Sequence, residues 1–190
     1  MPSISSLSAR TARLRVVIAL ATLACAESAT AATVAGAYVS HAGQNPLQAA
    51  AGESRHMTSR RLLSADGRWA VFASQATDLW GVVTDTNGTW DTMIEDQMSG
   101  TTLLVSHLPG LGGATGNGES VPRAISADGR FVAFSSLATD LVTGVTDVNG
   151  TWDAFLWDRS TGLISLLSRS SFDLNRAANL ASHPSRLSAD

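Results

Sequence analysis

The stretch SADGRFVAFSS, Ser126 to Ser136, predicts a tight turn followed by a β-strand. Its Ala-Asp-Gly segment supplies a glycine for a positive φ and an aspartate for capping the turn, and aromatic and β-branched residues follow. The chain carries a closely similar stretch, SADGRWAVFAS, at Ser64 to Ser74, which is 126 − 64 = 62 residues earlier. The fold is therefore expected to rest on a unit that the chain repeats.

The repeat extends well beyond these two stretches. An alignment of 64–106 with 126–168 needs no gap and gives 23 identical residues in 43 positions. The octapeptide TDTNGTWD (84–91) returns as TDVNGTWD (146–153), and LSAD at 187–190 begins a third copy. A fixed period without drift indicates one structural unit in tandem.

Each unit is predicted to contain four short strands and no helix. In the second copy the expected strands are 123–126, 130–136, 153–158 and 163–168. The glycine-rich stretch 109–118, before this copy, predicts a flexible connection. We therefore expect an all-β fold of four-stranded antiparallel sheets that cover one another's apolar faces, as the blades of a β-propeller do. A β-sandwich is the alternative, but it gives no reason for a tandem repeat.

Two segments resemble a known family. PRAISADGRFVAFSS (122–136) and DAFLWDRSTGLISLLS (153–168) are similar to the repeats of TolB-like β-propellers, the bacterial relatives of WD-repeat proteins. The resemblance covers nearly all of 59–190 and, weakly, 33–58. TolB itself has a separate α/β domain before its propeller, whereas here the first strand-like segment, 33–40, follows the predicted signal peptide almost at once. The resemblance therefore implies a generic exported propeller protein rather than TolB proper. It implies the following organisation: a partial blade at 32–58, blades at 59–120 and 121–182, and the start of a further blade at 183–190.

The number of blades is too small for a closed ring. Propellers close with about four to eight blades, and this chain encodes two with parts of others. The stop at Asp190, inside a turn motif, predicts a truncated sequence whose ring needs the remaining blades. The alternative is a short protein that oligomerises to close its ring.

The N-terminus predicts export. Three arginines precede the apolar run 16–26, and small residues follow at 29–31, which is the pattern of a secretory signal peptide over 1–31. A retained anchor is the alternative, but the run is too short to span a bilayer. Cys25 lies in a faint lipoprotein-like box, and Thr22 stands where a leucine-like residue is usual, so we do not expect lipid anchoring. The mature chain is expected to be periplasmic or extracellular, without cysteine.

Composition and motifs limit the kinds of partner and chemistry that we expect. The net charge is −3, with 13 basic and 16 acidic residues, which does not suit binding to nucleic acid phosphates. The chain contains neither a His-Glu-x-x-His metal motif nor a Gly-x-Ser-x-Gly nucleophile motif. Asp66 and Asp128 are predicted to cap turns, and Arg68 and Arg130 to pair with acidic groups on neighbouring strands.

The repeated octapeptide is the candidate site. Asp-x-Asn-Gly-x-x-Asp supplies three oxygen-bearing side chains per copy, and calcium prefers such loops, with Asp78 or Asp140 as additional ligands. The same pattern also forms a plain turn, because Asn-Gly favours left-handed backbone and Asp caps nearby N–H groups. Trp90 and Trp152 are either exposed ligand platforms or packing residues. The candidate calcium ligands are Asp85, Asn87, Asp91, Asp147, Asn149 and Asp153.

Three functions remain open on the sequence alone. The first is a non-enzymatic propeller that binds a protein or carbohydrate partner through its loops. The second is the propeller portion of a larger secreted hydrolase of the prolyl oligopeptidase type, which the resemblance allows. The third is a gene fragment without independent function.

Overall fold

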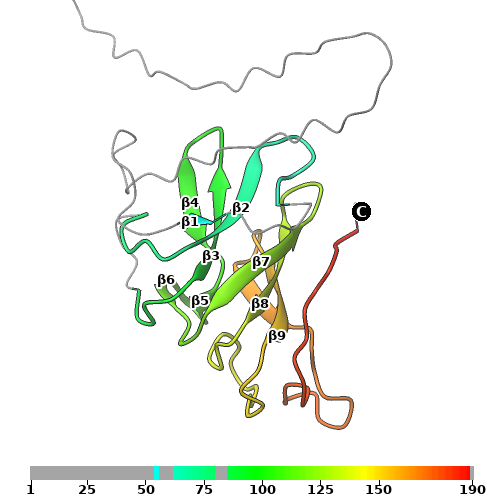
Figure 1. Ribbon diagram of the computed structural model, residues 1–190. Coiled ribbons are helices and arrows are strands. Elements are labelled where there is room, and N and C mark those ends of the chain that lie inside the picture. Colours follow the sequence, from blue (N-terminus) through cyan, green and yellow to red (C-terminus); the bar gives the residue numbers. More distant parts are fainter. Residues whose placement is uncertain (1–53, 56–61, 80–84, 189–190) are drawn as a thin grey trace, which may run out of the picture. The chain divides into compact units, whose positions relative to one another are not determined.

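The computed structural model describes residues 54–55, 62–79 and 85–188 (Figure 1). The predicted signal peptide and most of the predicted partial blade lie outside these residues. The described residues form strands, turns and loops without any helix, so the fold is all-β as expected. No helix among them is long and apolar enough to cross a membrane.

Two four-stranded antiparallel sheets make up most of the structure. Their strands occur in sequence order within each sheet, so every neighbour is the next strand along the chain (Figure 1). Sheet 1 contains β1 (Ser54–Arg55), β2 (Trp69–Ser74), β3 (Asp91–Asp96) and β4 (Thr101–Leu104). Sheet 2 contains β7 (Ser120–Ile125), β8 (Phe131–Ser136), β9 (Asp153–Asp158) and β10 (Leu163–Leu166).

The repeat in the sequence is a repeat in the structure. β2, β3 and β4 begin and end 62 residues before β8, β9 and β10, for example 131 − 69 = 62. The central pairs also have the same register, since Phe72 lies opposite Met93 as Phe134 lies opposite Phe155. We call residues 54–118 unit 1 and residues 120–181 unit 2. The two units thus share their central strands and the pairing between them.

The first strand breaks the period. Ser54 pairs with Ser74, and Ser120 pairs with Ser136, so Ser54 and Ser120 occupy the same place. From Ser54 to Ser64 the chain advances 64 − 54 = 10 positions, whereas from Ser120 to Ser126 it advances 126 − 120 = 6. Unit 1 therefore has four extra residues between its first strand and its turn.

The Ser-Ala-Asp-Gly-Arg segments form the predicted turns. In unit 1, Asp66 Oδ1 accepts hydrogen bonds from Ser64 Oγ (2.6 Å) and from the Arg68 amide (3.0 Å). Asp128 receives the same two bonds in unit 2, so the capping role predicted for both aspartates is confirmed. The guanidinium groups then form two-bond ion pairs with carboxylates on the third strand, Arg68 with Asp96 and Arg130 with Asp158.

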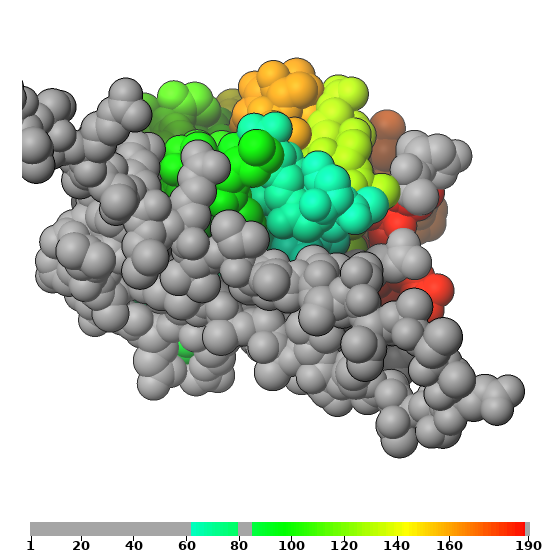
Figure 2. All heavy atoms as spheres, turned by 90° about the horizontal axis from the view of Figure 1, so that it is seen from above, coloured from blue at the N-terminus to red at the C-terminus, as the bar shows by residue number. Residues whose placement is uncertain are grey.

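The two sheets pack through opposite faces. In each sheet the side chains alternate between two faces, which we call face A and face B. Face A carries the row Phe72–Met93–Leu104 in sheet 1 and the row Phe134–Phe155–Leu166 in sheet 2. Face B carries the pair Val71–Ile94 in sheet 1 and the pair Ala133–Leu156 in sheet 2. The main core joins face B of sheet 1 to face A of sheet 2. Figure 2 shows residues 62–79, in cyan, directly beside the yellow-green atoms of the second sheet. One unit thus covers the apolar face of the next.

A glycine makes this close packing possible. Gly129, in the turn of unit 2, has φ 70°, and a Cβ placed on it would lie 2.3 Å from the Trp69 ring. The Arg159 guanidinium, also from unit 2, lies over the Trp69 ring, 3.8 Å from its centroid. The two turns also meet directly, because the Ala65 amide donates to the Ala127 carbonyl at 2.8 Å.

The glycine-rich stretch after sheet 1 is more regular than predicted. Instead of a flexible connection it forms a hairpin of β5 (His107–Leu108) and β6 (Leu111–Thr115), with a register shift at His107. His107 is buried and its Nε2 accepts a hydrogen bond from Trp157 Nε1 at 3.3 Å. The prediction was wrong because packing against the following unit, which local composition does not reveal, orders this segment.

Candidate functional site: the repeated Asp-x-Asn-Gly loops

The repeated octapeptide lies between the second and third strands of each unit. Its last residue begins the third strand, Asp91 in β3 and Asp153 in β9. Both loops are therefore at the same end of their sheets. This placement brings the predicted ligands of each copy together, three in each loop.

Backbone capping explains the shape of the first loop. Asp85 Oδ1 accepts hydrogen bonds from the amides of Asn87 (3.0 Å) and Gly88 (2.8 Å). Asn87 Oδ1 accepts from the Thr89 amide at 2.6 Å and from its hydroxyl at 2.7 Å. Gly88 has φ 64°, which an L side chain rarely adopts. The Asn-Gly pair and the aspartate thus form the turn that their residue types predict.

The Asn87 side chain ties the loop to the rest of unit 1. Its Nδ2 donates to the Gly116 carbonyl at 2.6 Å and, more weakly, to Asp91 Oδ1 at 3.4 Å. Asp91 Oδ1 also accepts from Ser106 Oγ at 3.0 Å, and Ser106 Oγ accepts from the Thr92 amide at 3.1 Å. The loop, the third strand and the segment after the fourth strand are therefore joined by one hydrogen-bond network.

Unit 2 repeats this network with its own residues. Asn149 Nδ2 donates to the Ala178 carbonyl at 2.5 Å and to Asp153 Oδ2 at 2.9 Å. Ser168 Oγ donates to Asp153 Oδ1 at 2.7 Å, as Ser106 does to Asp91. Sequence reasoning missed both serines. The identity of Ser106 and Ser168 in the repeat alignment was the signal that could have found them.

The aspartate at the start of each third strand is buried. Asp91 is 2% exposed and Asp153 is 0% exposed. Burial raises the pKa of Asp91 to about 7, with the nearby Asp85 carboxylate adding to the rise and the Ser106 hydrogen bond opposing it. Burial also raises the pKa of Asp153, and Asp147 contributes in the same direction. Each loop therefore holds a carboxyl group that is costly to ionise.

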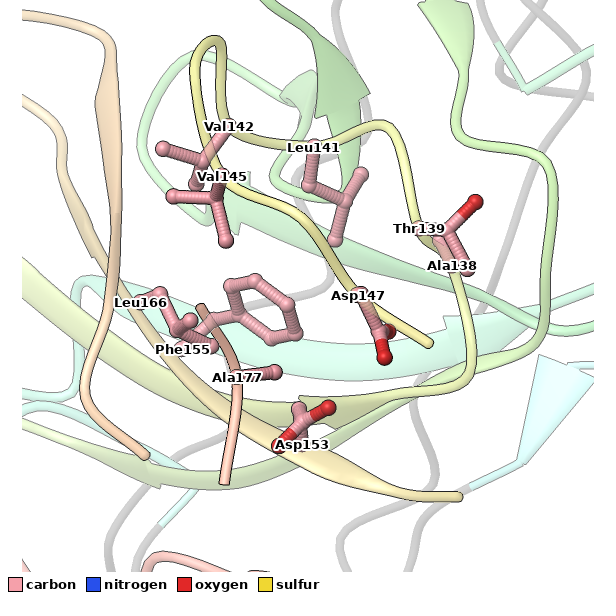
Figure 3. Close-up of a pocket in the computed structure, with 10 residues that line it drawn as sticks. All are labelled: Ala138, Thr139, Leu141, Val142, Val145, Asp147, Asp153, Phe155, Leu166 and Ala177. Carbon is pink, nitrogen blue, oxygen red and sulfur yellow. The ribbon is translucent and has the colours of Figure 1, made fainter. Parts of the chain in front are cut away.

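A small cavity lies beside the second loop. Asp147 and Asp153 both line it, together with Thr139 and a largely apolar wall that includes Phe155 and Leu166 (Figure 3). Two carboxyl groups that line one small cavity repel each other when both are ionised. The chemistry available there is the sharing of a proton or the binding of a small cation.

The calcium interpretation meets one geometric difficulty. The side chain of Asn87 directs its Nδ2 towards Asp91 and its Oδ1 towards Thr89, and Asn149 is arranged in the same way. An amide nitrogen does not bind calcium. Among the described residues, no group of three or more His, Cys, Asp or Glu side chains is placed to hold a metal ion. Asp140, a predicted additional ligand, accepts instead from the Asn117 amide.

The calcium site therefore stays a prediction, and a direct measurement tests it. EDTA-treated protein would be titrated with calcium chloride in a calorimeter. Bound calcium requires the asparagine amides to turn over, so the Asn87→Asp and Asn149→Asp variants should bind more tightly than the unmodified chain. The turn interpretation expects no binding heat from any of them.

The two loop tryptophans are half-buried, and their backbone links successive units. The Trp90 carbonyl accepts from the Ser120 amide at 2.7 Å, at the start of β7. The Trp152 carbonyl accepts in the same way from Ser182 at 2.7 Å, and its ring lies 6.1 Å from the ring of His183. The packing interpretation is favoured at Trp152 by its ring contact with His183, and both tryptophans are partly exposed as residues.

Comparison with known proteins adds no relative. No protein-family model matches the chain, and no curated protein matches it significantly.

Proposed function

We propose that this chain is part of an exported, non-enzymatic repeat protein of the β-propeller type that serves as a scaffold for binding a protein or ligand. The stacking of the units supports this proposal most strongly. Face B of sheet 1 packs on face A of sheet 2, so the contact is heterologous and can be continued by further units. Tandem four-stranded antiparallel sheets that cover each other in this way are the elements of a propeller.

The loops supply the surface on which a scaffold of this kind would bind. The two Asp-x-Asn-Gly loops precede equivalent strands, and each carries a half-buried tryptophan. Aromatic side chains with an exposed face are common in protein and carbohydrate recognition. Repetition would place one such loop on every unit, which favours binding to an extended or repeating partner.

The remaining parts of the proposal rest on the sequence. Export rests on the N-terminal pattern of arginines, apolar residues and small residues. The non-enzymatic role rests on the lack of a nucleophile or metal motif in this chain. The buried aspartates do not argue for catalysis, because Asp91 and Asp153 are covered and bonded to serine and asparagine.

A binding screen with a matched variant tests the scaffold role. The full chain would be screened against arrays of bacterial polysaccharides and surface proteins, beside the double variant Trp90→Ala, Trp152→Ala. The expected result is a partner that binds the unmodified chain with at least about tenfold higher affinity than the variant, which is about 1.4 kcal/mol. Equal binding by both would reject the loops as the binding surface, and turnover of an ester or peptide substrate would reject the non-enzymatic role.

A further inference from the structure

Unit 2 presents the same type of face that unit 1 has already used. Face B of sheet 1 is covered by face A of sheet 2, which leaves face B of sheet 2 as the corresponding surface on the other side. A heterologous contact uses two different surfaces, so each added unit offers a new copy of one of them. The question is whether the structure carries signs that this copy also receives a partner.

Burial differs at equivalent positions of the two units. Val105 is 0% exposed because it packs in the core between the sheets, whereas its counterpart Leu167 is 49% exposed. Ile94 is 0% exposed, and its counterpart Leu156 is only half-buried. The apolar residues on face B of unit 2 thus lie at the same positions as those of unit 1, but within the described part of the chain no neighbouring sheet buries them to the same extent.

The segment after unit 2 has already begun the same contact. The Ser182 amide donates to the Trp152 carbonyl as the Ser120 amide donates to the Trp90 carbonyl, each at 2.7 Å. His183 Nδ1 lies 2.9 Å from Ser135 Oγ, on face B of sheet 2. His183 is the counterpart of Val121 in β7, the strand of sheet 2 that packs on β2 and β3. Residues 182–188 therefore follow the path of a first strand.

We propose that face B of sheet 2, extended by Leu167, is the docking surface for a further unit of this repeat, which presents an apolar face A and has residues 182–188 as its first strand. This inference rests on the stacked array of the proposed function and names the partner of its open face. The occupant is a third unit rather than an unrelated protein, because the contact it would continue is already formed between units 1 and 2.

The third unit cannot be a plain copy of unit 2. A Cβ at Gly118 would lie 2.8 Å from the Ala138 amide nitrogen, so unit 1 needs this glycine to let unit 2 approach. A Cβ at Gly116 would lie 2.5 Å from Leu141 Cδ2 and 3.1 Å from Ala138 Cβ. The counterparts in unit 2 are Ala178 and Leu180. In the third unit, the loop after the second strand must therefore lie further from Ala178 and Leu180 than the loop of unit 2 lies from Gly116 and Gly118. A unit that fits after unit 1 thus differs from one that fits after unit 2.

A cysteine reporter tests the docking surface. With Cys25→Ser, the full chain has no other cysteine, and Leu167→Cys or Val105→Cys then reports the exposure of one position. In the chain without an appended unit, the Leu167→Cys variant should react with a maleimide at least about tenfold faster than the Val105→Cys variant. A third unit is then supplied by appending a second copy of residues 129–190 after Asp190, in register with the repeat.

Three extended chains separate the possibilities. The first carries Ala178→Gly and Leu180→Gly, and in it the reaction of Leu167→Cys should slow about tenfold. The second keeps Ala178 and Leu180 and should show clearly weaker protection. The third extended chain has the changes of the first and also carries valine in place of the glycine that begins the appended copy. This valine would collide with Phe131, so the protection of Leu167→Cys from the maleimide should be lost.

Several results would overturn the inference. One is an unchanged reaction of Leu167→Cys in the first extended chain, whether its third unit folds by circular dichroism or stays unfolded. Another is a reaction in the unextended chain that slows with protein concentration, which would assign the surface to a second copy. None of these results bears on partner binding by the loops, so the proposed function fails only in its own assay.

Discussion

Units 1 and 2 have the same hydrogen-bond framework but different faces. The turn bonds, the Arg–Asp ion pairs and the Asn–Asp–Ser network recur, and the largest difference is in the Asn–Asp bond, 3.4 Å in unit 1 and 2.9 Å in unit 2. The residues of face A differ between the two sheets, because Glu95 in sheet 1 occupies the position that Trp157 occupies in sheet 2. Trp157 meets His107 of unit 1, whereas Glu95 is buried in a different setting. The two units thus share a hydrogen-bond framework and differ in the residues that contact a neighbouring unit.

The largest expected effect sharpens this contrast in the core. Phe134→Ala should destabilise the protein by about 4 kcal/mol, because the side chain is 0% exposed and its loss leaves a cavity. Phe72→Ala, at the equivalent place, should cost about 1 kcal/mol less, since Phe134 also stacks on Phe155 with ring centroids 5.4 Å apart and Phe72 faces Met93. Urea unfolding monitored by tryptophan fluorescence measures both. Equal costs would show that the stacked pair adds nothing.

The turn glycines give the next largest difference. Gly67 and Gly129 have nearly the same φ, 71° and 70°, so Gly→Ala strains the backbone equally at both, by about 1 kcal/mol. Only Gly129 faces the Trp69 ring, and an added Cβ there has no room. Gly129→Ala should therefore cost about 3 kcal/mol in total. If the two variants have the same urea midpoint, the packing of Trp69 on the second turn does not contribute to stability.

The dependence of stability on pH separates two kinds of aspartate. Burial raises the pKa of Asp91 to about 7, so the folded state holds a proton that the unfolded state releases above its ordinary pKa of 3.8. Stability from this group is therefore complete below pH 3.8 and is lost as the pH rises to about 7, by up to about 1.4 kcal/mol per pH unit. Asp91→Asn should flatten this decline in the free energy of unfolding. An unchanged slope between pH 4.5 and 7 in the variant would assign the effect elsewhere.

The smallest expected effect has the opposite sign. Hydrogen bonds from Arg68 and Arg130 lower the pKa of Asp96 and Asp158, so their contribution is present above pH 3.8 and is lost as the pH falls through the folded-state pKa. Asp158→Asn should lower the Tm slightly at pH 7, and the difference from the unmodified chain should shrink in acid. A difference that grows in acid would contradict the assignment. The arginine side chains are 44% and 45% exposed, and solvent screening keeps the effect small.

Much of the fold was predictable, since it depends on local rules. The predicted third strand of the second copy, 153–158, agrees with β9 residue for residue, and the predicted second strand differs from β8 by one residue. The first strand was placed later than β7 and the fourth longer than β10, because strand ends depend on pairing with a neighbour. In the candidate site, the turn bonds of Asp85 and Asn87 follow from residue type. The burial of Asp91 and its bond to Ser106 do not.

The sequence by itself determined the period, the strands and the turns of this protein, because alternation, glycine and Asp-Gly segments act within a few residues of one another. Tertiary structure decided which face of a sheet meets the next unit, since that depends on residues far apart in the sequence, such as Trp69 against Gly129 and His107 with Trp157. It also ordered the hairpin 107–115 and buried the carboxyl groups of Asp91 and Asp153. These features arise only when neighbouring units exclude water from the space between them.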